Sequence, residues 1–307
     1  MYAVMDMGTT NTRIWLCDGD NVLSSKKGGF GAGSTKSHGK EYLFESLKAL
    51  INELVTEAGV EISRVERILV SGMAGSNIGL YDLPHIPIPA NLETLSKNLK
   101  EVRLDSICPI PFVFVPGLKK LDGNEIADVM RGEETETAGI LCLAPQCKDG
   151  ILVLPGTHNK VIETNEKGEI TDFFTSFSGE LLNIVMSHSI LAGQVMHGGE
   201  IVDVCVLDGA EFSKEKGLNA AIFHVRVMGM NGRSTDEMTS FLYGAVMGQD
   251  AEAIKKMAKG RKMYIGGRES LKKVYRLLLG DNAVPLDASV ADNAVRCALS
   301  ELYKVSN

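Results

Sequence analysis

The chain carries the stretch MGTTNTRI at residues 7–14 and the similar stretch PGTHNKVI at residues 155–162. Both contain Gly-Thr-x-Asn, and both lie between the first and second strands of a predicted three-strand run. The two glycines, Gly8 and Gly156, are 148 residues apart. Solenoid repeats have periods of roughly 20–50 residues, so a repeat at this distance indicates two copies of one domain.

Short apolar runs bounded by turn residues predict a strand before and after each copy. Asp18-Gly19-Asp20-Asn21 is a strong hairpin signal after the first copy, and Asn165-Glu166-Lys167-Gly168 is the corresponding turn after the second. The predicted strands are 2–6, 12–18 and 22–27 in the first run, and 151–154, 160–164 and 169–175 in the second.

Apolar spacing predicts most of the remaining elements. Helices are predicted at 41–58, 128–143, 179–191, from 234 onward, 269–279 and from Asp287 to near Tyr303, and strands at 67–71, 112–115 and 263–265. Ser234 and Glu237 have the spacing of a capping box. Because the strand pattern restarts after about residue 145, we predict an N-terminal domain at 1–145 and a C-terminal domain at 146–307.

The paired Gly-Thr turns suit a polyphosphate. Glycine lets backbone N–H groups approach an anion closely, and threonine hydroxyls can donate further hydrogen bonds. The predicted phosphate-binding residues are Gly8, Thr9, Thr10, Asn11, Gly156, Thr157 and His158. The alternative is that each turn is only a hairpin and that His158 is a structural turn residue.

Asp6 lies just before the first turn, where the second copy has Pro155. A carboxylate beside a phosphate is unfavourable unless a cation lies between them. We therefore predict that Asp6 binds a nucleotide-associated Mg²⁺ through water. The alternative role for Asp6 is to cap the turn.

Composition excludes several classes of protein. The 307 residues are 44% hydrophobic with a formal net charge of -7, which argues against nucleic acid or an anionic membrane as the partner. The six cysteines form no CxxC pair, and the first residues, MYAVMD, do not resemble a signal peptide. We expect a cytoplasmic protein with reduced thiols and small-molecule partners, with a homodimer left open.

Several blocks resemble known phosphotransferases. DMGTTNTR at 6–13, GTHN at 156–159 and IGGR at 265–268 are similar to the two phosphate motifs and the adenosine motif of the actin, Hsp70 and sugar-kinase superfamily. GMAGS at 72–76, DVMRGEET at 128–135, LPGTHNK at 154–160 and SGEL at 178–181 resemble the 2-dehydro-3-deoxygalactonokinase family in order and spacing.

The resemblance implies an α/β protein with the two-lobed actin-like ATPase fold, in which each lobe is a ribonuclease-H-like mixed sheet with flanking helices. It implies a sugar-acid kinase that uses ATP and Mg²⁺ to phosphorylate the C6 hydroxyl of 2-dehydro-3-deoxy-D-galactonate. It also implies adenosine binding by Gly266, Gly267 and Arg268.

Related sugar kinases place an acidic base on a helix before the second phosphate turn. Glu133 is our first choice because Gly132-Glu133 resembles the Gly-Asp pair of glycerol-kinase-like relatives, and Asp128 and Glu134 are the alternatives. The group could also be a solvated helix face. For the substrate carboxylate we predict Arg131, Ser76 and Gly75, because guanidinium, N–H and hydroxyl groups bind carboxylates.

Two other functions compete with this one. The first is a kinase for a different 2-keto-3-deoxy sugar acid or hexonate on the same scaffold. The second is a non-catalytic, nucleotide-sensing protein of the same fold. A Rossmann dehydrogenase is excluded because no GxGxxG follows the first strand.

Overall fold

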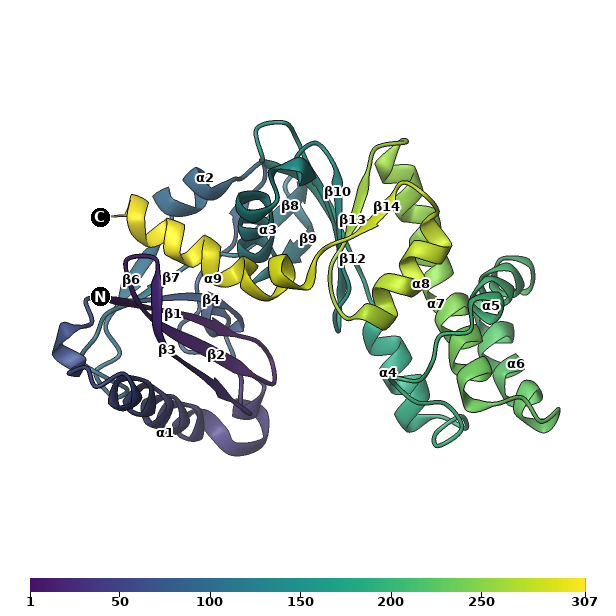
Figure 1. Ribbon diagram of the computed structural model, residues 1–307, viewed down its shortest axis with the longest axis horizontal. Coiled ribbons are helices and arrows are strands. Elements are labelled where there is room, and N and C mark those ends of the chain that lie inside the picture. The colour runs from purple at the N-terminus through teal and green to yellow at the C-terminus, as the bar shows by residue number, and fades with distance from the viewer. Residues whose placement is uncertain (307) are drawn as a thin grey trace. The chain divides into compact units, whose positions relative to one another are not determined.

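The computed structural model describes residues 1–306, and its contacts divide the chain into two compact units. Unit 1 contains residues 1–146, 168–171 and the chain from 289 on, and unit 2 contains residues 147–167 and 172–288. Figure 1 colours the chain from purple at its start to yellow at its end. No helix within residues 1–306 has the length and apolar character needed to cross a membrane.

A six-stranded sheet forms the centre of unit 1, in the order β3-β2-β1-β4-β7-β6. Its strands are β1 (Tyr2–Met7), β2 (Thr12–Asp18), β3 (Asn21–Gly28), β4 (Ile68–Gly72), β6 (Lys100–Val102) and β7 (Phe112–Phe114). The first three strands are antiparallel, and β4 is parallel to β1 and to β7. Strand β1 is central and almost wholly buried, as its run of apolar residues predicts.

Helices cover both faces of this sheet (Figure 1). The helices of unit 1 are α1 (Ser34–Glu57), α2 (Leu92–Lys97), α3 (Glu133–Leu143) and α9 (Ala288–Val305), and α1 and α9 lie on opposite faces of the sheet. Ala3, Met5 and Met7 alternate toward the core that also contains the leucines of α1. Tyr2 points to the other face, where its ring stacks on Tyr303 of α9 with centroids 3.8 Å apart.

A second, three-stranded sheet of unit 1 has the order β5-β8-β9. Its strands are β5 (Ile86–Pro87), β8 (Leu118–Asp122) and β9 (Glu125–Met130). The helix predicted over 128–143 is therefore wrong in its first part, because residues 128–130 pair with β8 and the helix begins only at Glu133. Gly132 separates the two elements, with a φ of 110° that a residue with a side chain rarely adopts.

Unit 2 repeats the strand order of the first sheet. Its five strands run β12-β11-β10-β13-β14, so the meander β10–β12 corresponds to β1–β3, and β13 lies parallel to β10 as β4 does to β1. The bounds are β10 (Ile151–Leu154), β11 (Asn159–Thr164), β12 (Ile170–Ser176), β13 (Met263–Ile265) and β14 (Ala283–Pro285). The duplication predicted from the Gly-Thr-x-Asn repeat is thus present in the topology.

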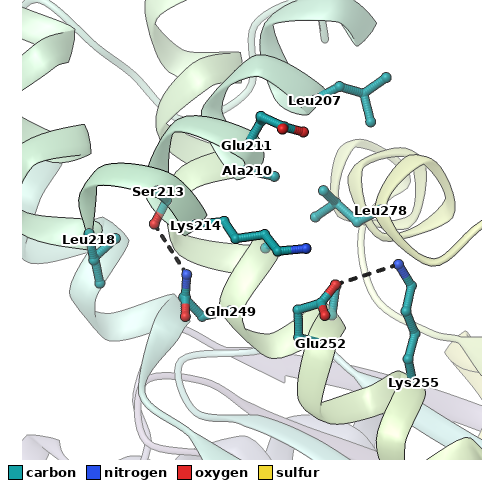
Figure 2. A pocket seen from close by; sticks show the side chains of 13 residues that line it. Leu207, Ala210, Glu211, Ser213, Lys214, Leu218, Gln249, Glu252, Lys255 and Leu278 are labelled. Carbon is teal, nitrogen blue, oxygen red and sulfur yellow. Dashed lines mark hydrogen bonds and ion pairs between the residues drawn. The ribbon is translucent and has the colours of Figure 1, made fainter.

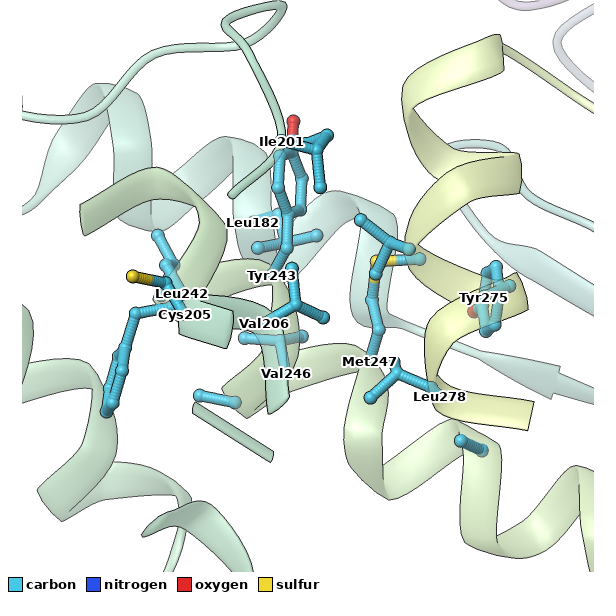
Figure 3. Close-up of a cluster of buried hydrophobic side chains, with 14 of the residues drawn as sticks. Leu182, Ile201, Cys205, Val206, Leu242, Tyr243, Val246, Met247, Tyr275 and Leu278 are labelled. Carbon is cyan, nitrogen blue, oxygen red and sulfur yellow. The ribbon is translucent and has the colours of Figure 1, made fainter. Parts of the chain in front are cut away.

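Five helices of unit 2 surround a large apolar core. They are α4 (Ser178–His188), α5 (Asp203–Lys216), α6 (Leu218–Met230), α7 (Thr235–Ala258) and α8 (Glu269–Leu279). Figure 3 shows side chains of α5, α7 and α8 meeting in this core, among them Val206, Val246 and Leu278. The predicted capping box is confirmed, since Ser234 and Glu237 each accept a backbone N–H of the other.

The last helix departs from the predicted domain division. The prediction placed all of 146–307 in one C-terminal domain, whereas α9 packs into unit 1. Gly139 of α3 lies so close to α9 that an added Cβ would be 1.8 Å from the Ala294 carbonyl oxygen. Tyr303 of α9 also donates a 2.6 Å hydrogen bond to Glu66. These contacts join segments that are distant in sequence, so local patterns do not reveal them.

Candidate active site

The first Gly-Thr turn connects β1 to β2. The Gly8 N–H donates a 2.9 Å hydrogen bond to the Asn11 carbonyl, which closes the turn through the backbone alone. Thr9, Thr10 and Asn11 are exposed. This geometry leaves the tip of the turn open to a ligand.

The glycine-rich loop 28–33 packs against the backbone of this turn. The Ala32 N–H donates to the Gly8 carbonyl at 3.0 Å, and the Gly33 N–H donates to the Thr9 carbonyl at 2.8 Å. A Cβ at Gly31 would lie 2.4 Å from the Gly8 carbonyl oxygen. Only glycine permits this approach, so the loop holds the turn by direct backbone contact.

Asp6 faces Arg13 across β1 and β2. The Arg13 Nη2 donates to Asp6 Oδ2 at 2.7 Å, and the Asp6 side chain is 19% exposed. Within residues 1–306 no three acidic, histidine or cysteine side chains are grouped so as to hold a metal ion. Mg²⁺ characteristically keeps several waters and binds one or two carboxylates plus substrate phosphates, and a single partly exposed carboxylate beside the turn fits that role.

The three glutamates at the start of α3 have different environments. Glu133 is half-buried, and its Oε2 accepts the Arg131 N–H at 3.1 Å. Glu136 is also half-buried, and burial, followed by the charges of Glu133 and Asp6, raises the pKa of its carboxyl to about 7. The charges of Asp6 and Arg13 both act on Glu136, so α3 begins near the end of β1.

Glu134 is the exception, because its side chain is fully buried. Its Oε2 accepts the Gly132 N–H at 2.7 Å, and its Oε1 accepts the Thr135 hydroxyl at 3.0 Å. Burial, with the charge of Glu133, raises the pKa of Glu134 to about 7. A general base must reach the substrate hydroxyl, and Glu134 is the least exposed of the three glutamates.

Asp128 lies on strand β9 and not on a helix with the glutamates. Its Oδ1 accepts the N–H of its neighbour Val129 at 2.7 Å. The prediction that Asp128 and Glu133 share one helix is wrong, because the strand ends at Met130 and the chain turns at Gly132.

The residues predicted to bind the substrate carboxylate lie together. The Arg131 Nη2 donates to the Leu83 carbonyl at 2.6 Å and lies 3.3 Å from His85 Nδ1. The Arg131 Nη1 is buried beside Gly75, where an added Cβ would be only 2.9 Å away, and it makes no hydrogen bond. The Ser76 hydroxyl donates to the Met73 carbonyl at 2.7 Å.

The second Gly-Thr turn connects β10 to β11 and is closed differently. The Gly156 N–H donates to the side-chain Oδ1 of Asn159 at 3.0 Å, and Asn159 is only 2% exposed. Gly156, Thr157 and His158 are exposed. A tight glycine again supports the turn, since a Cβ at Gly179 would lie 1.9 Å from the Gly156 carbonyl oxygen.

The start of α4 adjoins this turn. The Glu180 N–H donates to the Thr157 carbonyl at 2.7 Å, and His158 Nε2 lies 2.6 Å from Glu180 Oε2. Helix N-termini favour anions through their free N–H groups and the helix dipole. The predicted phosphate residues of unit 2 thus lie beside the N-terminus of α4, where the Ser178 and Glu180 N–H groups already donate to the Ser176 hydroxyl and the Thr157 carbonyl.

The predicted adenosine motif joins β13 to α8. The Gly266 N–H donates to the Val153 carbonyl at 2.9 Å, and Gly267 has a φ of 82° with Pro155 close by. Arg268 is exposed and directly precedes the first residue of α8. Gly267 and the second Gly-Thr turn are thus adjacent within unit 2.

A separate groove of about 720 Å³ lies between α5, α7 and the end of α8 (Figure 2). Glu252 and Lys255 form an ion pair at 3.8 Å on its wall, and Lys214 extends across it. None of the catalytic, nucleotide-binding or substrate-binding residues predicted from the sequence, all of which lie within residues 1–306, lines this groove.

Residues 6–302 match the model of the family described as 2-keto-3-deoxy-galactonokinase. The chain belongs to the 2-keto-3-deoxy-galactonokinase family. A 2-dehydro-3-deoxygalactonokinase of Escherichia coli (strain K12) is 32% identical over 260 residues, which cover 83% of this chain and 80% of that protein. Family membership confirms the predicted class of enzyme, a sugar-acid kinase.

Solved structures confirm the predicted fold. A Sinorhizobium meliloti protein, provisionally assigned as a 2-dehydro-3-deoxygalactonokinase, has a TM-score of 0.79 at 24% identity, covering 99% of each chain. The activator of the 2-hydroxyisocaproyl-CoA dehydratase from Clostridium difficile has a TM-score of 0.57 at 13% identity, covering 99% of this chain and 94% of that one. The chain thus has the actin-like ATPase fold, with a ribonuclease-H-like sheet in each unit.

Proposed function

We propose that this family member transfers the γ-phosphoryl group of ATP to the C6 hydroxyl of 2-dehydro-3-deoxy-D-galactonate, as a step of galactonate catabolism. The observation that carries the proposal is the pair of exposed Gly-Thr-x-Asn turns, one in each unit, each closed on its glycine N–H and supported by a tight glycine. Phosphoryl transfer depends mainly on positioning and on stabilising charge, which such turns supply.

For the nucleotide, we propose phosphate binding at both turns and adenosine binding at Gly266, Gly267 and Arg268. The N-terminus of α4 lies beside the second turn, and the helix dipole favours negative charge there. The C. difficile activator, which has a similar fold, was solved with bound ADPNP. Asp6 would bind Mg²⁺ through water, and the ion would supply positive charge to the phosphates.

For the acceptor, we propose that Glu133 removes the C6 hydroxyl proton while that oxygen bonds to the γ-phosphorus and the bond to ADP breaks. Glu133 is accessible, whereas Glu134 is fully buried and Asp128 lies on a different element. The charges of Glu133 and Asp6 act on the neighbouring Glu136 and raise its pKa, so Glu133 stands in a cluster of acidic side chains. The substrate carboxylate would bind at Gly75 and Ser76, beside the positive charge of Arg131.

A coupled ADP-release assay over a panel of 2-keto-3-deoxy sugar acids and hexonates tests this function. We expect the highest kcat/KM for 2-dehydro-3-deoxy-D-galactonate, and ADP release without any acceptor serves as the control. A higher kcat/KM for another acid would support the alternative kinase. Nucleotide binding without ADP release on any acceptor would support a nucleotide-sensing protein.

A further inference from the structure

The two Gly-Thr-x-Asn turns use their asparagines in opposite ways. Asn11 is exposed, and its Nδ2 donates a 2.9 Å hydrogen bond to the hydroxyl of its neighbour Thr10. Asn159 is buried and closes its turn through Oδ1. The shape of the second turn therefore depends on what holds the Asn159 side chain.

Two residues from distant helices hold it. The Asn159 Nδ2 donates to Asp250 Oδ2 of α7 at 3.1 Å and to the Tyr275 hydroxyl of α8 at 2.9 Å. The Tyr275 hydroxyl in turn donates to the same Asp250 oxygen at 2.9 Å. Burial and the adjacent Asp250 raise the pKa of Tyr275 well above its usual value, so the hydroxyl remains a donor.

The other oxygen of Asp250 holds the start of α4. The Ser176 and Ser178 hydroxyls donate to Asp250 Oδ1 at 2.6 Å and 2.9 Å. Asp250 is only 7% exposed. Its carboxylate accepts four hydrogen bonds, from the second turn, from α8 and from the segment that begins α4. Burying a carboxylate costs free energy unless hydrogen bonds compensate for the lost water. The Asp250 carboxylate has these hydrogen bonds, and through them it connects Asn159 of the second turn to the start of α4.

We propose that Asp250 is a positioning residue for the phosphates of the nucleotide. It does not contact the ligand. It fixes Asn159, which sets the direction of the Gly156 N–H, and it fixes the start of α4, whose Gly179 supports the same turn. This inference rests on the proposed function, because the turn is taken to bind the phosphates of ATP.

The decisive variant is Asp250→Asn, which keeps the shape of the side chain but places an amide against four donors. Hydrogen bonds to charged groups are stronger than neutral ones. We expect the KM for ATP and the Kd for ADP, measured by calorimetry, to rise about 10–100-fold, while the KM for the sugar acid stays within about twofold. Tyr275→Phe keeps the ring and the hydrogen bond from Asn159 to Asp250. It should therefore weaken ADP binding less than Asp250→Asn does.

Met247→Ala is the control, since Met247 is a buried apolar residue one turn earlier on α7. It should lower stability without removing a hydrogen bond of the Asp250 network, so ADP affinity should remain near the wild-type value. If Asp250→Asn and Met247→Ala weaken ADP equally, or if Asp250→Asn leaves ADP affinity unchanged, the positioning role is wrong. If Asp250→Asn does not fold, wild-type ADP affinity in Tyr275→Phe overturns it.

The ADP measurement separates this inference from the proposed function. Wild-type protein that binds ADP but phosphorylates no sugar acid would refute the proposed reaction while leaving the Asp250 comparison intact. Wild-type protein that binds neither ATP nor ADP would refute both.

Discussion

The buried carboxyl of Glu134 makes the stability of unit 1 depend on pH. Its side chain is fully buried among internal hydrogen bonds, and its pKa is raised from 4.5 to about 7 by burial and by Glu133. We consider the change Glu134→Gln, which removes the titrating group and keeps the size of the side chain.

Proton linkage decides whether the free energy of unfolding rises or falls with pH. The folded protein holds this proton more tightly than the unfolded chain, so the stabilisation is fully present below pH 4.5 and is lost as the pH rises through about 7. With these two pKa values, the contribution of Glu134 to the free energy of unfolding falls by about 2.5 kcal/mol between pH 5 and pH 8.

Urea denaturation at several pH values between 5 and 8 measures this contribution. The free energy of unfolding of wild type minus that of Glu134→Gln should fall by about 2.5 kcal/mol across this range. Glu101→Gln, at an exposed position on β6, should stay within about 0.5 kcal/mol of wild type throughout. A wild-type-minus-Glu134→Gln difference that is the same at pH 5 and pH 8 would refute the reasoning.

The remaining predictions concern the catalytic residues and the packing of α9. Glu133→Gln should lower kcat by about 10²–10⁴-fold while calorimetric binding of ATP and sugar acid persists. Asp128→Asn is its control, and loss of turnover there instead would move the base to β9. Asp6→Asn should lower kcat roughly 100-fold or more at saturating Mg²⁺. Near-wild-type turnover would show that Asp6 does not bind the metal ion. Gly139→Ala should lower the free energy of unfolding by about 1–3 kcal/mol, because its Cβ would overlap a carbonyl of α9. Gly29→Ala, which meets no neighbouring atom within 4 Å, should be near neutral in the same urea titration.

Local signals predicted the central strands of both units well. The predicted strands 12–18, 151–154 and 263–265 match β2, β10 and β13 residue for residue. The small sheet β5-β8-β9 was not predicted. Its strands are short and partly exposed, so they lack the continuous apolar run that marks a central strand.

The acidic run 128–136 shows where sequence reasoning fails at the site. Its carboxylates look alike in sequence, and helical spacing was extended back to Asp128. The structure distinguishes them by burial and by element, placing Asp128 on a strand, Glu133 at an accessible helix start and Glu134 inside unit 1. Burial depends on what packs against the helix, and that packing comes from residues distant in sequence.

The sequence by itself determined the duplicated domain, the two Gly-Thr turns and the family, because these follow from local patterns and from motif order. Only the tertiary structure decided that α9 joins unit 1 and that Asn159, unlike Asn11, is held from within. Asp250 is 91 residues from Asn159 and Tyr275 is 116 residues from it. A hydrogen bond between side chains so far apart in sequence forms only when the sheet and its helices have packed, so no local signal can record it.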